Sequence, residues 1–381
     1  MSDGTQRTAA TFSDAMTTFL DLARVVATNL VLFGHASQIF YPPQAITTGG
    51  IGVVIFFLLS GFLITLTTAR RWERPGLQFR NFMIDRVARI FTPFIPVLIA
   101  VALTNVIVGI APHPILGVNT GPFAFLGNML LLHDYPVFQF LSHFGPVANV
   151  YPRAYNAAEP FWTIPIEFWT YAVFAFVAFV LVRREKPGLV SSGLLLIGLP
   201  VFIWNGFAGG AGNLSLLWIL GSIGGILWLN MQLDRRARIR LGGAILGFGL
   251  LCAAGRIADA GFKSYDMHMN LLAAMIFFGM VMIVSAFERW PSLIARPIAF
   301  LASYSYSLYL VHNTVIIVFH ERFQGISPEV RFVSGMIVAH VIAIVAYYLF
   351  ERHYHAVGRY LKMRLPSTGA SIPSTSVKPF G

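Results

Sequence analysis

The sequence predicts an all-α, polytopic integral membrane protein with about ten transmembrane helices and both termini in the cytoplasm. Of the 381 residues, 56% are hydrophobic and only 11% are charged, whereas soluble domains carry about 25% charged residues. The formal charge of +11 would point to nucleic acid in a soluble protein. Here most basic residues lie in short segments between apolar runs, so we expect the lipid bilayer as a partner and no nucleic acid.

Ten apolar runs have about the 20 residues needed to cross the ~30 Å hydrocarbon core of a bilayer. They are, in chain order, 16–40, 50–69, 90–110, 161–182, 188–205, 213–230, 241–259, 268–287, 298–320 and 329–351. The run 188–205 is the weakest, because it is short and contains Pro200. A long outer loop, 111–160, follows the third run, and its apolar stretch 123–132 is too short to span the bilayer.

The two ends are expected to be disordered cytoplasmic segments, 1–13 and 359–381, around a membrane domain at 14–358. The N-terminal segment is polar and lacks the basic-then-apolar layout of a signal peptide, so the first apolar helix should remain in the mature protein. The C-terminal segment is rich in Ser, Thr, Pro and Gly from Pro366 onward.

The distribution of lysine and arginine tests this count. With the N-terminus in the cytoplasm, only five of the 27 basic residues fall on the outer side, and Arg24 alone lies within a span. This asymmetry follows the positive-inside rule. An error of one span would mix the basic residues assigned to the cytoplasmic side with those assigned to the outer side. The observed asymmetry therefore favours ten spans.

The first apolar span contains two polar residues, Arg24 and His35. Eleven residues at 100° each amount to about three turns, so both side chains lie on one helix face, ~16 Å apart along the axis. An arginine inside a span usually faces a bundle interior or a wet cavity. The alternative is that Arg24 snorkels to the membrane surface and His35 caps the helix end.

Glu167 is a third polar residue within an apolar span, 161–182. It is predicted to lie near the depth of His35, with Thr163 one turn away on the same face. Because a carboxylate and an imidazole stabilise each other when buried, we expect His35 to meet Glu167 as a base for a hydroxyl group. The alternative is a glutamate that closes a hydrogen bond between helices.

Two further polar features lie in other spans. Ser305, Tyr309 and His312 follow helical spacing and form one stripe, although His312 could equally be a satisfied core histidine. Ser60 precedes Gly61 in "LLSGFLI", a pair that permits close helix approach and is, taken alone, more typical of packing.

Arg86 and Arg89 lie three residues apart at the mouth of the third span. They could bind the phosphates of a nucleotide-bearing donor. They could also be topology signals or contacts to anionic lipid, as we favour for Arg70, Arg71 and Arg74.

Metal and hydrolase motifs are not evident in the sequence. The outer-loop histidines His113, His133 and His143 match no metal-site spacing. There is no Gly-rich phosphate loop, Cys cluster or Gly-x-Ser-x-Gly elbow. We therefore expect no metal ion and no permanently bound cofactor.

Five motifs in order resemble the membrane acyltransferase family 3, whose members O-acylate carbohydrates and some small secondary metabolites. The motifs are "LDLARVVATNLVLFGHA", "LLSGFLI", "RVARIFTP", "WTIPIE" and "YSLYLVH", and the resemblance extends from residue 20 to about 355. Each motif is weak alone, but the five in this order are specific.

The resemblance implies an enzyme that transfers an acetyl or other short acyl group from cytoplasmic acyl-CoA, its co-substrate, to a hydroxyl of a carbohydrate or glycosylated metabolite. It implies that His35, with Glu167, is the catalytic base or acyl relay, and that Arg24, Arg86 and Arg89 serve donor binding. The residues implied to line the acceptor site or pore are Ser60, Trp162, Thr163, Ser305, Tyr309 and His312.

The resemblance also implies a multi-pass protein of the bacterial cytoplasmic (inner) membrane, with homo-oligomerisation left open. Many relatives append a soluble hydrolase-like domain; this chain is expected to act without one, alone or with a separate partner. The alternative function is a proton-coupled transporter or exporter of small polar solutes, because intramembrane Arg, His and Glu also form proton relays. Against it, inverted repeats are not evident. A scaffold for envelope assembly would leave these polar residues unexplained.

Overall fold

The computed structural model describes residues 12–110, 119–141, 152–208, 210–261 and 265–365. These residues are mostly helical, and none of them forms a β-strand, so the predicted all-α class is confirmed. His113 and His143 of the outer loop, and most of both terminal segments, lie outside the described residues.

The long helices follow the predicted spans closely. They are α1 (Asp14–Phe40), α2 (Gly49–Arg70), α3 (Phe79–Val108), α6 (Thr163–Ala175) with its π-helical continuation η5 (Phe176–Val182), α7 (Leu189–Phe207), α8 (Leu214–Asn230), α9 (Arg235–Ala260), α10 (Met267–Val284), α12 (Ser305–Arg322) and α13 (Pro328–Leu349).

Shorter elements lie between and after them. They are the helices α4 (Gly121–Met129), α5 (Pro136–Leu141), α11 (Ser292–Ser303) and α14 (Tyr354–Arg364), and the 3-10 turns η1 (Pro42–Gln44), η4 (Glu159–Trp162), η6 (Ala211–Asn213) and η7 (Glu351–His353). The apolar stretch 123–132 thus falls mainly in the nine-residue helix α4.

Among the described residues, eight helices are long and apolar enough to cross a membrane. The other two expected spans are helical as well. Leu214–Asn230 is apolar but has 17 residues, and α12 carries polar residues through its middle, including His312 and Asn313. The middle of α12 is buried among neighbouring helices, which can supply the hydrogen-bond partners that lipid lacks.

Three predicted boundaries are wrong. The expected span 298–320 is broken at Tyr304, whose backbone (φ −107°, ψ 13°) separates α11 from α12. The third span begins earlier than residue 90, because α3 starts at Phe79 and carries the arginine cluster into the helix. The tail expected to be disordered from residue 359 is helical to Arg364.

Local capping explains several of these helix ends. The Ser13 side chain accepts a hydrogen bond from the Met16 amide at the start of α1, so Ser13 belongs to the ordered domain. Asp234 and Asp266 cap α9 and α10 in the same way. Gly109, at φ 65°, ends α3 in the left-handed conformation that glycine adopts without strain.

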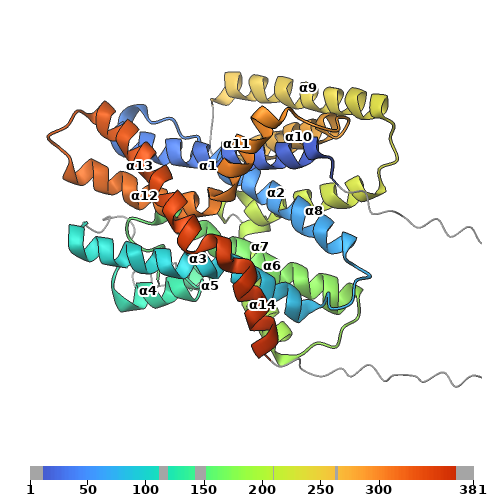
Figure 1. Cartoon of the computed structure of the whole chain (residues 1–381), viewed down its shortest axis with the longest axis horizontal. Helices are drawn as coiled ribbons and strands as arrows, with labels where there is room; N and C mark the ends of the chain where they lie inside the picture. Colours follow the sequence, from blue (N-terminus) through green and yellow to red (C-terminus); the bar gives the residue numbers. More distant parts are fainter. Residues whose placement is uncertain (1–11, 111–118, 142–151, 209, 262–264, 366–381) are drawn as a thin grey trace, which may run out of the picture.

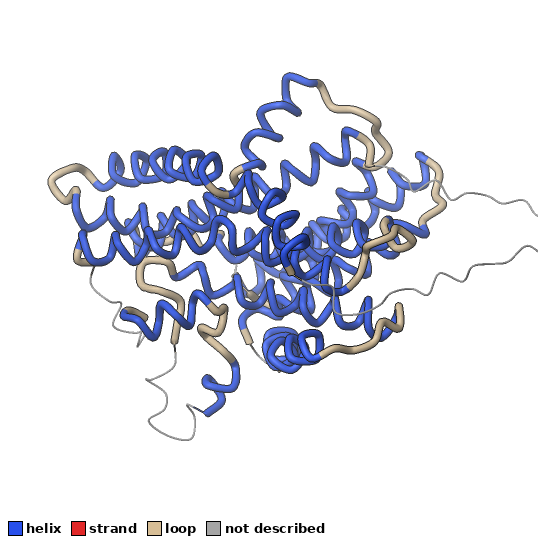
Figure 2. The backbone as a smooth tube through the Cα atoms, turned by 60° about the horizontal axis from the view of Figure 1, so that its bottom comes forward, coloured by secondary structure: helices blue, strands red, loops and turns tan. Residues whose placement is uncertain are grey.

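The long helices run side by side, and most of their connections lie at the two ends of the bundle (Figures 1 and 2). The α1–α2 and α12–α13 connections meet at the left end of Figure 1, and the α2–α3 connection lies at the right end. This alternation agrees with the sides that the basic residues predict. Five elements, α1, α2, α3, α6 and α12, pack around a common centre, which holds the candidate site.

Two glycines bring α2 and α8 into close contact. A Cβ atom on Gly61 would meet the Trp218 carbonyl oxygen, and one on Gly221 would meet the Leu58 carbonyl oxygen. Small residues at such a crossing let two helix backbones approach within a membrane. Ser60, next to Gly61, is thereby held against the centre of the bundle.

Replacing Gly221 by leucine should separate α2 from α8 and destabilise the protein. Overpacking of this kind typically costs about 1–3 kcal/mol, and here the obstacle is backbone, which cannot rotate away. Thermal unfolding of the purified variant in detergent measures the loss. Gly247→Leu is the matched control, because a Cβ on Gly247 of α9 meets nothing within 4 Å. Equal unfolding temperatures for the two variants would contradict the packing argument.

Candidate functional site

A cavity of about 190 Å³ lies between α1, α2, α3, α6 and α12. Its polar lining comes from all five helices and contains most of the site residues expected from the sequence. These polar residues are Arg24, Ser60, Arg86, Arg89, Thr163, Glu167, Tyr171, Ser305, Tyr306 and Tyr309.

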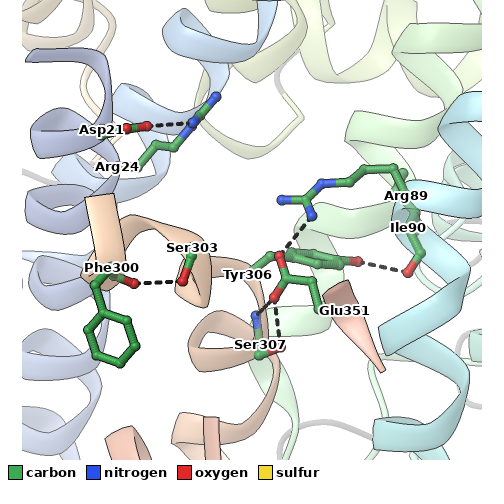
Figure 3. A network of polar contacts seen from close by, with 9 residues as sticks. All are labelled: Asp21, Arg24, Arg89, Ile90, Phe300, Ser303, Tyr306, Ser307 and Glu351. Atoms are coloured by element: carbon green, nitrogen blue, oxygen red, sulfur yellow. Dashed lines mark hydrogen bonds and ion pairs between the residues drawn. The ribbon is translucent and has the colours of Figure 1, made fainter. Parts of the chain in front are cut away.

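Three arginines converge on one end of this cavity, and two of them have acidic partners. Arg24 pairs with Asp21 on its own helix at 2.9 Å, and Arg89 pairs with Glu351 at 2.8 Å. Figure 3 shows Arg24 and Arg89 reaching toward the same space from different helices.

Arg86 differs from its two neighbours. Among the described residues no carboxylate forms an ion pair with it, and its buried Nε atom has no hydrogen-bond partner. Its guanidinium lies over the rings of Phe82 and Tyr171, at 5.3 and 5.7 Å. Because buried charges are normally paired, Arg86 is a cation able to receive an anion.

Glu351 forms the ion pair with Arg89, and no motif in the sequence points to it. Its side chain is 1% exposed. One carboxylate oxygen accepts hydrogen bonds from the Ser307 amide (2.9 Å) and hydroxyl (2.7 Å), and the other receives Arg89 (Figure 3). The carboxylate therefore connects η7, α3 and the first turn of α12.

Glu167 forms its contacts within the cavity, with Ser60 and Tyr171. The Ser60 hydroxyl lies 3.3 Å from the Glu167 carboxylate and 2.7 Å from the Tyr171 hydroxyl. The Tyr171 hydroxyl also donates to Glu167, and Trp218 Nε1 donates to Ser60 Oγ at 3.2 Å. Tyr171, four residues after Glu167, was a partner that helical spacing could have identified.

His35 meets His312, and the expectation that it meets Glu167 is wrong. His35 Nδ1 lies 3.3 Å from His312 Nε2, with ring centroids 5.2 Å apart. No hydrogen bond or ion pair joins His35 to Glu167, although both residues are described. Helical rise predicts the depth of each residue along its helix, whereas the rotation of the helix about its axis depends on packing.

The backbone determines the proton positions in the histidine pair. His312 Nδ1 lies 2.8 Å from the Tyr309 carbonyl oxygen and 3.1 Å from that of Leu308, so this nitrogen must carry the hydrogen. In the neutral ring, His312 Nε2 is then an acceptor for His35 Nδ1–H. The lone pair of a neutral His35 consequently resides on Nε2, where a proton can be accepted. Asn313 contributes a further side-chain hydrogen bond to His35.

Tyr309 separates the cavity from the histidine pair. Its hydroxyl bonds the Thr163 hydroxyl at 2.5 Å and donates to the Pro160 carbonyl oxygen at 2.7 Å. Its ring centroid lies 5.9 Å from that of His312. The stripe Ser305–Tyr309–His312 predicted from the sequence thus runs from the cavity lining to the histidine pair, while Trp162 borders a second cavity.

No cluster of three His, Cys, Asp or Glu side chains within the described part of the chain is arranged to hold a metal ion. The side chains at the site supply guanidinium groups and hydroxyl groups along the cavity and an imidazole pair beyond Tyr309.

The chain is similar to one protein-family model and to several known proteins. A family model described as an acyltransferase domain matches residues 17–348. A Staphylococcus aureus (strain COL) protein, whose O-acetyltransferase name is itself provisional, is 24% identical over 365 residues, covering 89% of this chain and 57% of that protein. The chain thus spans little more than half the length of this relative.

Two shorter matches have related names. The peptidoglycan O-acetyltransferase OatA of Listeria monocytogenes is 28% identical over 164 residues, covering 41% of this chain and 24% of that protein. An O-acetyl transferase of Shigella phage Sf6 is 36% identical over 81 residues, covering 20% of this chain and 23% of that protein. No solved structure matches the chain.

Glu351→Gln should destabilise the protein, because it leaves Arg89 without its counter-ion inside the bundle. Breaking a buried ion pair typically costs ~3–5 kcal/mol, and we expect the lower end because 36% of the Arg89 side chain is exposed. Thermal unfolding in detergent measures the effect.

Asp85→Asn is the matched control for this variant. It breaks the Lys362–Asp85 pair (2.6 Å), whose side chains are 32% and 43% exposed, and exposed pairs contribute about 0–1 kcal/mol. Similar losses in the two variants would refute the structural role of Glu351.

Proposed function

This chain belongs to the acyltransferase family whose model spans residues 17–348, and from that premise we propose that it transfers a short acyl group from acyl-CoA to a hydroxyl of a carbohydrate or glycosylated metabolite. The observation that carries the proposal is a cavity lined by Arg86, which forms no ion pair with a carboxylate of the described residues, and by a polar stripe that leads from the cavity to two bonded histidines. The relatives named as O-acetyltransferases support an acetyl group.

The arginine end of the cavity is the donor side in this proposal. Coenzyme A is polyanionic, and guanidinium groups are suited to binding phosphate. Arg86 forms no ion pair with a carboxylate of the described residues, while Arg24 and Arg89 are held by Asp21 and Glu351. The basic residues of the sequence predict that this end faces the cytoplasm, where acyl-CoA is available.

The size of the cavity favours a short acyl group. Sites for drug-sized ligands occupy about 300–1,000 Å³, whereas this cavity measures about 190 Å³. We propose that the acyl end of the donor enters it while the nucleotide remains at the arginine mouth. Ser60, Thr163 and Tyr309 then face the acyl thioester along the cavity wall.

His35 acts as the general base in the proposed reaction. Its Nε2 accepts the proton of the acceptor hydroxyl as the oxygen bonds to the acyl carbon, and the carbon–sulfur bond breaks to release coenzyme A as its thiolate. The proton held on His35 returns to that sulfur. His312 keeps His35 in the reactive tautomer through the Nδ1–H···Nε2 hydrogen bond. Glu167 holds Ser60 and Tyr171 in position beside the donor.

Arg86→Gln should weaken acetyl-CoA binding. Hydrogen bonds to a charged group contribute about 1.5–3 kcal/mol, which corresponds to roughly a 10- to 150-fold increase in Kd. The measurement is thermal stabilisation of the purified chain across an acetyl-CoA titration. Arg236→Gln, an exposed arginine of α9, is the matched control. A transporter of unrelated solutes would give no acetyl-CoA-dependent stabilisation even in the native protein.

His35→Ala should abolish acyl transfer while leaving acetyl-CoA binding intact. General bases contribute roughly 10²–10⁴-fold in rate. His312→Gln removes the ring that fixes the tautomer, so its kcat should fall by less than that of His35→Ala. The readout is release of coenzyme A thiol in the presence of acceptor, with acetyl-CoA stabilisation as the folding check. Near-normal turnover by His35→Ala would contradict the role of His35 as the general base.

A further inference from the structure

A second cavity, of about 330 Å³, is lined by Glu159 and Trp162 of η4, the turn whose Pro160 carbonyl oxygen accepts a hydrogen bond from Tyr309 of the stripe. Loop residues 133–135, the segment around η4 and helix α7 form its walls. Its aromatic lining consists of Tyr135, Trp162 and Trp204. Its charged lining consists of Asp134, Arg153 and Glu159. None of the proposed donor chemistry uses this cavity.

The charge of this cavity is unlike that of the first. It has two carboxylates against one guanidinium, whereas the first has three guanidiniums against one carboxylate. His133 adds no positive charge near neutral pH, because burial lowers the pKa of its imidazole. An anionic ligand such as a phosphate or a lipid headgroup is therefore disfavoured here.

The aromatic groups are held firmly. The backbone carbonyl of Trp204 accepts a hydrogen bond from the Gly210 amide at 2.9 Å, and a Cβ on Gly210 would lie 2.5 Å from Trp204 Cδ1. The Tyr135 hydroxyl donates to the Ile197 carbonyl oxygen at 2.9 Å. Trp162 packs edge-on against Tyr265 at 5.8 Å. Rigid aromatic faces beside planar polar groups suit a ring with hydroxyls on its edge and C–H groups on its face.

Hydrogen bonds join the wall of this cavity to the histidine stripe. The Pro160 carbonyl oxygen accepts from Tyr309, and the Ala157 carbonyl oxygen accepts from Asn313 at 3.0 Å. On the other side, Phe161 accepts from the buried His133 at 3.0 Å. The segment 157–162 therefore has one side in the second cavity and the other bonded to α12 beside His312.

We propose that this second cavity, built around Trp204, Trp162 and Asp134, is a binding site for a neutral saccharide, separated from the histidine pair by the segment 157–162. This inference rests on the proposed function for the identity of the reaction, but the site itself is argued from its own walls. The charge pattern of the sequence puts this cavity at the outer end of the bundle, where an envelope or exported saccharide is accessible.

The test measures equilibrium binding of two neutral probes, chitotetraose and maltotetraose, to the purified full chain in a detergent without a sugar headgroup. Acetyl-CoA binding is measured on the same samples. We expect at least one tetraose to bind with a Kd of about 1 mM or tighter, and Trp204→Ala to weaken it about tenfold or more. Trp228→Ala, which removes an indole packed on Phe62 of another region, should leave Kd unchanged, and acetyl-CoA should bind all three proteins equally.

A second variant guards against a folding defect in Trp204→Ala. Glu159 is exposed, so Glu159→Gln should fold normally and still weaken the tetraose severalfold. The site is refuted if neither tetraose binds, if both cavity variants match Trp228→Ala, or if glycerol 3-phosphate binds in a Trp204-dependent way instead. Trp204-dependent tetraose binding without acetyl-CoA binding would support the saccharide site and contradict the proposed function. Acetyl-CoA binding without tetraose binding would support the proposed function and contradict the saccharide site.

Discussion

The buried carboxylate of Glu351 is the interaction on which the central cavity depends. Placing an ion inside a bundle costs several kcal/mol unless every lone pair finds a donor, and Glu351 receives three donors from α3 and α12. Those bonds fix the Arg89 guanidinium at the cavity and hold the start of α12 against α3. The remaining polar side chains are arranged around that junction, so the geometry of the site depends on the pairing of the Glu351 carboxylate with Arg89.

Imidazole groups occupy a different part of the protein interior from guanidinium and hydroxyl groups. Guanidiniums from α1 and α3 line the cavity together with hydroxyl groups, and imidazoles lie beyond Tyr309. Each group has its own partners, which is how ionisable residues persist inside a membrane protein. In the proposed reaction this order matches the parts of the substrates, from the anionic donor to the hydroxyl of the acceptor.

Much of the fold was predictable because the thickness of the bilayer sets the length of its helices. The depth of Arg24 and His35 on one helix was likewise fixed by helical rise, and α1 carries both. The partner of His35 was not predictable, since the rotation of α1 against α6 and α12 depends on tertiary packing. Glu351 was missed because a glutamate beside an arginine at the end of a span looks like a topology signal.

The break at Tyr304 gives the cavity a source of charge that belongs to no side chain. A continuous helix through residues 298–320 would bury its amide groups in its own hydrogen bonds at this depth. Because α12 starts at Ser305, a new helix N-terminus lies at this depth, and its Ser307 amide donates to the Glu351 carboxylate. Glu351 therefore also interacts favourably with the positive end of the α12 macrodipole, in addition to Arg89. That partial charge is a property of the backbone, so it remains in place when an arginine of the cavity is substituted.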